Sequence, residues 1–240
     1  MLSITIDNDV FCFRVFYRFL QNTVFFLGMP RGSCIYWADL PTLMTRLDAA
    51  ARWITVILNP AVVAVLAFLF LSGLQTEGSW RWIVWAVILG PGIPSLYAVT
   101  IYMVGKASSV FLPDARQRVV PLLLAAVSCC FGAWQLTRLE SPPYAVHLMS
   151  AYGLMALVSG IVSRRWGISL HAAGVCGPWV VGLVTVGSGY VWALPLPVAI
   201  GWARVRSRGH TLVQVLVGAI LGCASALVTW WLVSKLGIDH

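Results

Sequence analysis

The sequence predicts an all-α fold, a polytopic bundle of six to seven transmembrane helices. Apolar residues make up 60% of the chain and charged residues only 10%, whereas soluble domains carry roughly 25% charge. The mean hydropathy is +0.86, and long apolar runs alternate with short polar segments. Because each span needs about 20 residues, the 240 residues leave room for a single transmembrane domain, which we expect over residues 44–240.

Residues 1–43 have a different character from the rest. Their apolar stretch, 10–27, contains Arg14 and Arg18 and many aromatic side chains, which is typical of a segment lying at the membrane surface. The basic start and small-residue cleavage site of a signal peptide are not present in this stretch. Met44, just before the first clear span, is an alternative start. We therefore interpret residues 1–43 as an N-terminal extension, either interfacial or without function.

The first two predicted spans each contain a helix-breaking sequence. The span over 53–73 includes Asn59-Pro60, and proline is a common cause of kinks in helices. The span over 80–104 includes Gly90-Pro91-Gly92-Ile93-Pro94, which should break or bend it near its middle. Backbone groups freed inside a membrane must find partners within the protein. We therefore expect side chains of neighbouring helices to bond to these breaks.

Five further spans are expected over residues 119–136, 144–162, 169–186, 190–202 and 211–236. Pro195 and Pro197 shorten the sixth, and His147 within the fourth should hydrogen-bond inside the bundle, away from the loops. An even number of spans separates the polar loops 106–118, 164–167 and 204–210, so all three should lie on one side of the membrane. Segments far apart in the sequence can then form one site.

Each of these loops offers groups that suit a phosphate ester. Guanidinium forks match phosphate oxygens better than lysine does, and a helix N-terminus presents free N–H groups to an anion. The spacing of residues in the third loop also suits a site. His210 follows Arg204 after five intervening residues, and a helix would place Gln214 on the same face as His210. The candidate site residues are Arg116, Arg118, Ser169, His171, Arg204, His210 and Gln214.

These segments together resemble the type-2 phosphatidic acid phosphatase superfamily, which also includes the vanadium haloperoxidases. Its three motifs are Lys-x6-Arg-Pro, Pro-Ser-Gly-His and Ser-Arg-x5-His-x3-Asp. The corresponding segments here are 116–121, 168–171 and 203–214, in the same order, and the glycine that usually follows the third motif is Gly218. The resemblance covers roughly residues 100 to 220. The lysine of the first motif and the proline and glycine of the second are missing.

The resemblance implies a chemical role for each matching residue. His210 would be the nucleophile that forms a phosphohistidine, and His171 the general acid for the leaving alcohol. Arg116, Arg118, Arg204 and the Ser169 hydroxyl would bind the phosphoryl oxygens. Gln214 replaces the family aspartate; its amide oxygen can fix the tautomer of His210 but brings no negative charge. A catalytically weakened relative is therefore one alternative.

The expected substrate is a phosphate or diphosphate carried on a lipid or isoprenoid, because the site lies at the ends of membrane spans. Prenyl diphosphates, undecaprenyl-type carriers and phosphatidic acid all remain open, as does the oligomeric state. No Asp/Glu cluster offers a metal site, so we expect no metal or other cofactor. A nucleic-acid partner is not expected, because the +8 net charge is spread over short loops. The competing class is a non-enzymatic transporter or anionic-lipid-binding protein, which broken helices would also suit.

The distribution of basic residues predicts the orientation. The side with the three loops carries ten of them, Arg46, Arg52, Lys106, Arg116, Arg118, Arg164, Arg165, Arg204, Arg206 and Arg208. The opposite side has little beyond Arg81, Arg138 and Lys235. The positive-inside rule then places the site on the cytoplasmic face of the cell (inner or plasma) membrane.

Overall fold

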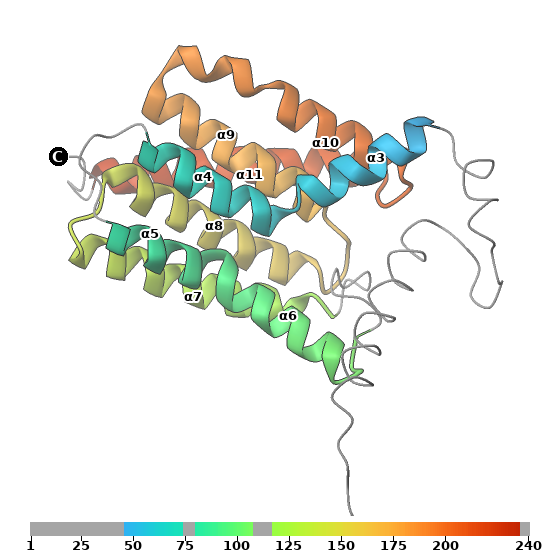
Figure 1. Cartoon of the computed structure of the whole chain (residues 1–240), viewed down its shortest axis with the longest axis horizontal. Helices are drawn as coiled ribbons and strands as arrows, with labels where there is room; N and C mark the ends of the chain where they lie inside the picture. The colour runs from blue at the N-terminus through green and yellow to red at the C-terminus, as the bar shows by residue number, and fades with distance from the viewer. Residues whose placement is uncertain (1–45, 74–79, 108–116, 236–240) are drawn as a thin grey trace, which may run out of the picture.

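The computed structural model describes residues 46–73, 80–107 and 117–235. The predicted extension, residues 1–43, lies outside these ranges. Within them every regular element is a helix, which confirms the all-α prediction. The helices lie side by side along one direction in a single bundle (Figure 1).

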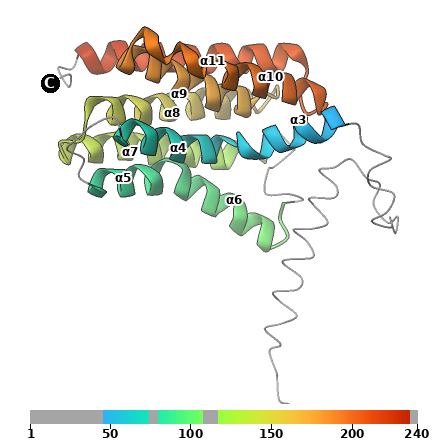
Figure 2. The ribbon, with the colours of Figure 1, turned by 45° about the horizontal axis from the view of Figure 1, so that its top comes forward.

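The chain passes back and forth through the bundle (Figures 1 and 2). The bent pair α3–α4 forms one pass and α5–η2–α6 the next. Then α7, α8, α9, α10 and α11 follow as antiparallel neighbours, with the short η3 between α9 and α10. The bounds are α3 (Arg46–Ile57), α4 (Pro60–Gly73), α5 (Trp80–Val87), η2 (Ile88–Gly92), α6 (Ile93–Met103), α7 (Val119–Arg138), α8 (Pro143–Val162), α9 (Leu170–Val186), η3 (Ser188–Ala193), α10 (Pro195–Arg206) and α11 (Leu212–Lys235).

Several of these helices are long and apolar enough to cross a membrane. In the described ranges four qualify, Trp80–Met103, Val119–Arg138, Pro143–Val162 and Leu212–Lys235, and the bent pair α3–α4 would make a fifth. Helices α9, with 17 residues, and α10, with 12, are shorter than the length that a span usually needs. The structure therefore supports a membrane protein with four to five candidate spans, fewer than the six to seven expected.

The predicted kink at Asn59-Pro60 is confirmed. Helices α3 and α4 meet there at an angle of 58°. Asn59 caps α4, since its Oδ1 accepts the backbone N–H of Ala61 at 2.9 Å and Pro60 takes the first helical position, where its missing N–H costs nothing. The dipeptide thus ends one helix and starts the next.

The second predicted interruption bends the backbone without ending the helix. Residues Ile88–Gly92 form a π-helical turn around Pro91, which keeps α5 and α6 in one continuous span. The Ser128 hydroxyl of α7 donates a hydrogen bond to the carbonyl of Leu89 in this turn. A neighbouring helix therefore supplies the partner that the freed backbone was expected to need.

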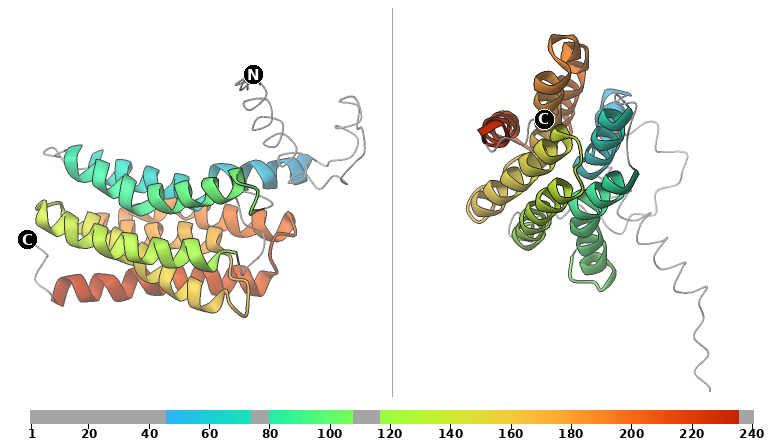
Figure 3. Two further views of the ribbon diagram at one scale, coloured as in Figure 1. Left: turned by 90° about the horizontal axis from the view of Figure 1, so that it is seen from below. Right: turned by 90° about the vertical axis from the view of Figure 1, so that its left-hand side faces the viewer.

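The helix ends that the three polar loops connect lie at the same end of the bundle, as predicted. Figure 1 shows α6, α8 and α10 ending, and α7, α9 and α11 beginning, at its right-hand end, where α3 also begins. The view from below in Figure 3 shows the same arrangement. One detail differs: α10 continues to Arg206, so Arg204 and Arg206 belong to a helix rather than to the loop. Cationic side chains are stabilised in the last turn of a helix by its dipole.

Helices α9 and α11 approach each other unusually closely. A Cβ on Gly218 would lie 2.5 Å from the carbonyl oxygen of Ser169, and one on Gly222 would lie 2.4 Å from that of Ala173. Only glycine fits at these contacts, and small residues allow such close packing between membrane helices. The contact fixes the start of α9 against the start of α11.

The interior of the bundle also contains the predicted histidine contact. His147 of α8 is buried, and its Nε2 donates a hydrogen bond to the carbonyl of Ala226 in α11 at 2.7 Å. This confirms His147 as a residue that links two helices within the bundle.

Candidate functional site

The structure brings most of the predicted site residues to one end of the bundle. Arg116 lies outside the described residues. The others occupy loop–helix junctions: Arg118 immediately before α7, Ser169 at the N-cap of α9, His171 as the second residue of α9, Arg204 in the last turn of α10, His210 in the loop 207–211, and Gln214 in the first turn of α11.

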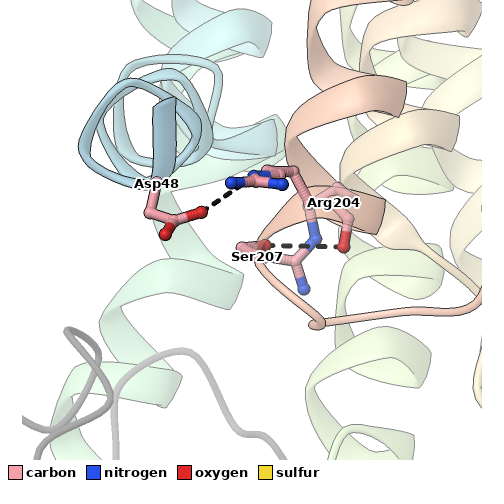
Figure 4. Close-up of polar contacts among 4 residues, drawn as sticks. Asp48, Arg204 and Ser207 are labelled. Carbon is pink, nitrogen blue, oxygen red and sulfur yellow. Dashed lines mark hydrogen bonds and ion pairs between the residues drawn. The ribbon is translucent and has the colours of Figure 1, made fainter. Parts of the chain in front are cut away.

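The loop 207–211 folds around Arg204. The backbone carbonyl of Arg204 accepts hydrogen bonds from the N–H of His210 at 3.3 Å and from the hydroxyl of Ser207 at 3.4 Å. The guanidinium lies directly under Gly209, where a Cβ would be 2.5 Å from Nη2. Arg204 is only 8% exposed. Figure 4 shows Arg204 and Ser207 at this turn. The fold therefore holds a buried cation next to the loop that carries His210.

Gln214 fixes the start of α11 through a reciprocal capping pair. Its Oε1 accepts the backbone N–H of Thr211 at 3.0 Å, and its own N–H donates to the Thr211 hydroxyl at 3.3 Å. This is the capping box of a Thr-x-x-Gln sequence. The backbone carbonyl of Gln214 also accepts the N–H of Ser169 at 3.2 Å. The second and third motif segments are thus joined through Gln214.

The same amide oxygen determines the tautomer of His210. Oε1 of Gln214 lies 3.1 Å from Nδ1 of His210. Because the backbone N–H of Thr211 can only donate, the amide atom between these two groups must be the oxygen. Nδ1 of His210 must then donate its proton to it, which leaves Nε2 of the neutral ring with a free lone pair. That is the protonation state required of a nucleophilic imidazole.

Some of the buried polar atoms without partners belong to residues at this end of the bundle. Among the described residues they include Nε2 of His171, Nε of Arg204 and Nη1 of Arg52 in α3. Buried polar groups in proteins are nearly always hydrogen-bonded, so such atoms need an explanation. An anion bound among them would accept a hydrogen bond from Nε of Arg204, and from Nε2 of His171 once that ring is protonated.

Ser169 occupies a different environment from the one implied by the resemblance. Its side chain is fully buried, and its Oγ accepts the backbone N–H of Ala172 at 3.4 Å as the N-cap of α9. The hydroxyl is therefore first of all a helix cap. The hydroxyl can still donate its one proton in a hydrogen bond to a phosphate oxygen.

The electrostatic environment keeps both imidazoles neutral. The pKa of His210 is lowered to about 4, mainly by burial and also by the charges of Arg204 and Arg118, while the hydrogen bond that His210 donates to Gln214 acts in the opposite direction. Burial also lowers the pKa of His171 well below its usual range, with Arg204, His210 and Arg118 adding to the shift. Burial and nearby cations both disfavour a charged imidazole. The site at neutral pH therefore has two uncharged rings and two guanidinium groups.

This environment predicts that anion binding depends on pH. The folded pKa of His210, about 4, lies below the value of about 6.5 for an unfolded chain. The unfolded state therefore binds more protons between these values, and the stability of the empty protein falls as the pH drops through this window. A bound anion raises the folded pKa, so anion binding takes up protons and strengthens at lower pH.

Sulfate is a suitable probe because it stays dianionic throughout this range. We expect sulfate to raise the Tm of the protein in detergent, followed by tryptophan fluorescence, more at pH 5 than at pH 7.5. Equal increments at the two pH values would show that neither imidazole contacts the anion.

Arg206 links two helices instead of facing the candidate site. Its Nε lies 2.8 Å from Oδ1 of Asp48 in an ion pair that links α10 to α3. Figure 4 shows Asp48 reaching from α3 to this pair, with Arg204 beside it. Two arginines two positions apart on α10 thus have different surroundings, and only Arg204 was a candidate site residue.

Two groups at the site were not predicted. Thr211 carried a usable signal, because Thr-x-x-Gln before an apolar helix is the capping-box pattern. The backbone of Thr55 in α3, which lies within hydrogen-bonding reach of His171, carried none, since a carbonyl group has no sequence signature. Within the described ranges no three His, Cys, Asp or Glu side chains gather as metal ligands would, and the charge facing an anion comes from arginine.

Comparison of the chain with protein-family models, curated proteins and solved structures found no match. The resemblance in the three motif segments therefore stands on their residues and spacing. The structure adds that these segments meet in space.

Proposed function

We propose that this protein is an integral membrane phosphatase that hydrolyses a lipid or isoprenoid phosphate or diphosphate through a phosphohistidine. The observation that carries the proposal is the orientation of His210, whose Nδ1–H is held by Gln214 while its Nε2 keeps a lone pair. Arg204 is buried beside it, and His171 has an unpartnered Nε2. A nucleophile, a second imidazole and a guanidinium are the groups that phosphoryl transfer requires.

In the first step, Nε2 of His210 attacks the phosphorus and the bond from phosphorus to the leaving oxygen breaks. The electron pair of that bond goes to the leaving oxygen, which takes a proton from Nε2 of His171. The bound phosphate makes this possible, because its negative charge raises the pKa of His171 above that of the empty site. Arg204 and Arg118 stabilise the equatorial oxygens. The products are the free alcohol and a phosphohistidine.

In the second step, water attacks the phosphorus of the phosphohistidine. Neutral His171 accepts a proton from the water at Nε2, and the phosphorus–nitrogen bond breaks with its electron pair returning to His210. Inorganic phosphate leaves with the newly formed P–O bond. The sum of both steps is hydrolysis of the ester, and both histidines return to their starting states.

The proposed substrate is lipid-linked because the site residues lie at the ends of apolar helices. A headgroup could meet Arg118 and Arg204 while its tail remains among the helices or in the bilayer. We propose in addition that α9 and α10 also cross the membrane, which gives seven passes, and that the site faces the cytoplasm of a cell membrane. The excess of arginine at this end of the bundle supports that orientation.

The test is phosphate release from farnesyl monophosphate, farnesyl diphosphate and a short-chain phosphatidic acid in detergent, with EDTA present throughout. We expect release of inorganic phosphate from at least one of them. Binding of these lipids without any turnover would contradict the phosphatase and favour an anionic-lipid-binding or transport protein. Turnover that is slow yet saturable would identify a weakened relative, consistent with the missing negative charge at Gln214.

A further inference from the structure

The break between α3 and α4 leaves one backbone acceptor without its usual helical partner. In a continuous helix the carbonyl of Thr55 would accept the N–H of Asn59. Here the N–H of Asn59 donates to Val56 at 3.3 Å instead, and the next residue, Pro60, has no N–H to offer. Thr55 is 1% exposed, so water cannot satisfy its carbonyl. The Asn59-Pro60 sequence thus creates a buried acceptor.

That acceptor meets the ring of His171. The backbone of Thr55 lies within hydrogen-bonding reach of His171, and since Nε2 of the ring is buried without a partner, Nδ1 is left to face this carbonyl. A carbonyl only accepts hydrogen bonds, so Nδ1 carries the proton. Nε2 of His171 is then the atom left to face a substrate, in the same tautomer that Gln214 imposes on His210.

The bend is held against the N-terminal part of α9. Gly174 lies one turn after His171, and a Cβ there would be 2.9 Å from Cβ of Pro60. Pro60 therefore packs directly on the backbone of α9 at a point where no side chain fits. The helix that carries His171 and the helix break that carries its acceptor are fixed to each other by this contact.

We propose that the α3–α4 bend, formed by the Thr55 carbonyl, Pro60 and the facing Gly174, is the positioning element of His171. It holds Nε2 of the ring toward the leaving oxygen, as Gln214 holds His210 toward the phosphorus. This inference rests on the proposed phosphatase function for the role of His171. Thr55 and Pro60 lie outside the part of the chain that the resemblance covers, and Gly174 lies within it but belongs to none of the three motif segments.

A pair of matched substitutions on α9 tests the proposal. Gly174→Ala places a methyl group within 2.9 Å of Pro60, whereas Gly177→Ala, one turn further, meets nothing closer than 3.5 Å. Misplacing a catalytic group by about 1 Å can lower a rate on the order of 10²-fold. We expect Gly174→Ala to lower kcat by this amount on an alkyl phosphate, whose leaving group needs a proton. The loss on p-nitrophenyl phosphate, whose leaving group needs none, should be much smaller, and Gly177→Ala should keep the wild-type ratio.

A second measurement does not depend on activity. Nitrogen NMR of ¹⁵N-histidine-labelled protein reports the tautomer of each neutral ring, and the His171 signals are assigned with His171→Gln. We expect a single Nδ1-protonated form in the wild type and in Gly177→Ala, and a mixture of tautomers in Gly174→Ala and in Pro60→Ala. Pro60→Ala restores an N–H at the break and so lets the helix continue.

The outcomes separate this inference from the function on which it rests. A wild type without phosphatase activity contradicts the proposed function, while the tautomer measurement still decides whether the bend orients His171. An unchanged tautomer and an unchanged substrate ratio in Gly174→Ala would overturn the positioning role. A folded Gly174→Ala protein is recognised by a Tm close to that of Gly177→Ala. If Gly174→Ala does not fold, the tautomer of His171 is measured in Pro60→Ala instead, and an unchanged tautomer there would overturn the positioning role.

Discussion

Replacing His210 with alanine should abolish phosphate release, with a fall in kcat of at least about 10³-fold. The reason is that Nε2 of His210 forms the covalent bond to phosphorus in the proposed reaction. Among the described residues, Gln214 orients only this imidazole, so no second nucleophile would replace it. The measurement is release of inorganic phosphate from the substrate that the wild type prefers. Acid-labile ³²P labelling of the protein should disappear in the same variant.

A second histidine provides the control for this variant. His147 is buried and hydrogen-bonds to Ala226 between α8 and α11, away from the candidate site. His147→Gln keeps a donor for that carbonyl, and we expect it to lower the Tm while leaving kcat close to the wild-type value. Substantial turnover or ³²P labelling by the His210→Ala protein would mean that His210 is not the nucleophile.

Replacing Arg204 with lysine should lower kcat/KM by about 10²-fold or more, although the positive charge is kept. Lysine is a point charge on a flexible stem and cannot bind two phosphoryl oxygens side by side as a guanidinium does. The space around Arg204 is also shaped for the planar group, which lies directly under Gly209. Removing one stabilising donor from a phosphoryl or acyl-transfer site typically costs a factor of this size. The loss is measured in steady-state kinetics, and sulfate should stabilise the variant less than the wild type.

Arg206→Lys is the matched control, two positions along the same helix. Arg206 forms a partly exposed ion pair with Asp48, and exposed pairs contribute at most about 1 kcal/mol. We expect Arg206→Lys to keep wild-type kcat/KM and sulfate response. Equal losses in the two variants would show that general positive charge, rather than the guanidinium of Arg204, matters at this end of the protein.

The elements that depend on local chemistry were predictable from the sequence. Asn59-Pro60 bends the chain because proline lacks an N–H and asparagine caps the following helix, and both properties belong to those two residues alone. The turn around Pro91 was less predictable: it was expected to break or bend the helix, and a π-helical turn with a partner in Ser128 keeps it continuous. Whether a helix continues through a proline depends on the hydrogen-bond partners that the neighbouring helix provides. The sequence of a single segment does not contain that information.

In the candidate site, too, some contacts were predictable from the sequence and others were not. The spacing of His210 and Gln214 predicted a contact between them on one helix face. Nδ1 of His210 does meet Gln214, but His210 lies in the loop before α11, so the contact is made at the capped start of the helix. The fully buried capping role of Ser169 and the ion pair of Arg206 were not predicted. Each depends on a partner from a distant segment, or on a degree of burial that only the packed bundle sets.

By itself the sequence determined the all-helical class, the helix breaks, the shared end of the three loops and the pairing of His210 with Gln214. These follow from hydropathy, from proline and capping chemistry and from the helical repeat, all of which act over a few residues or along one helix. Only the tertiary structure decided what surrounds His171, because the carbonyl proposed to hold its ring is that of Thr55, on a helix more than a hundred residues earlier in the chain. That carbonyl is available because the helix breaks, and it reaches the ring because Pro60 packs on the bare backbone of Gly174.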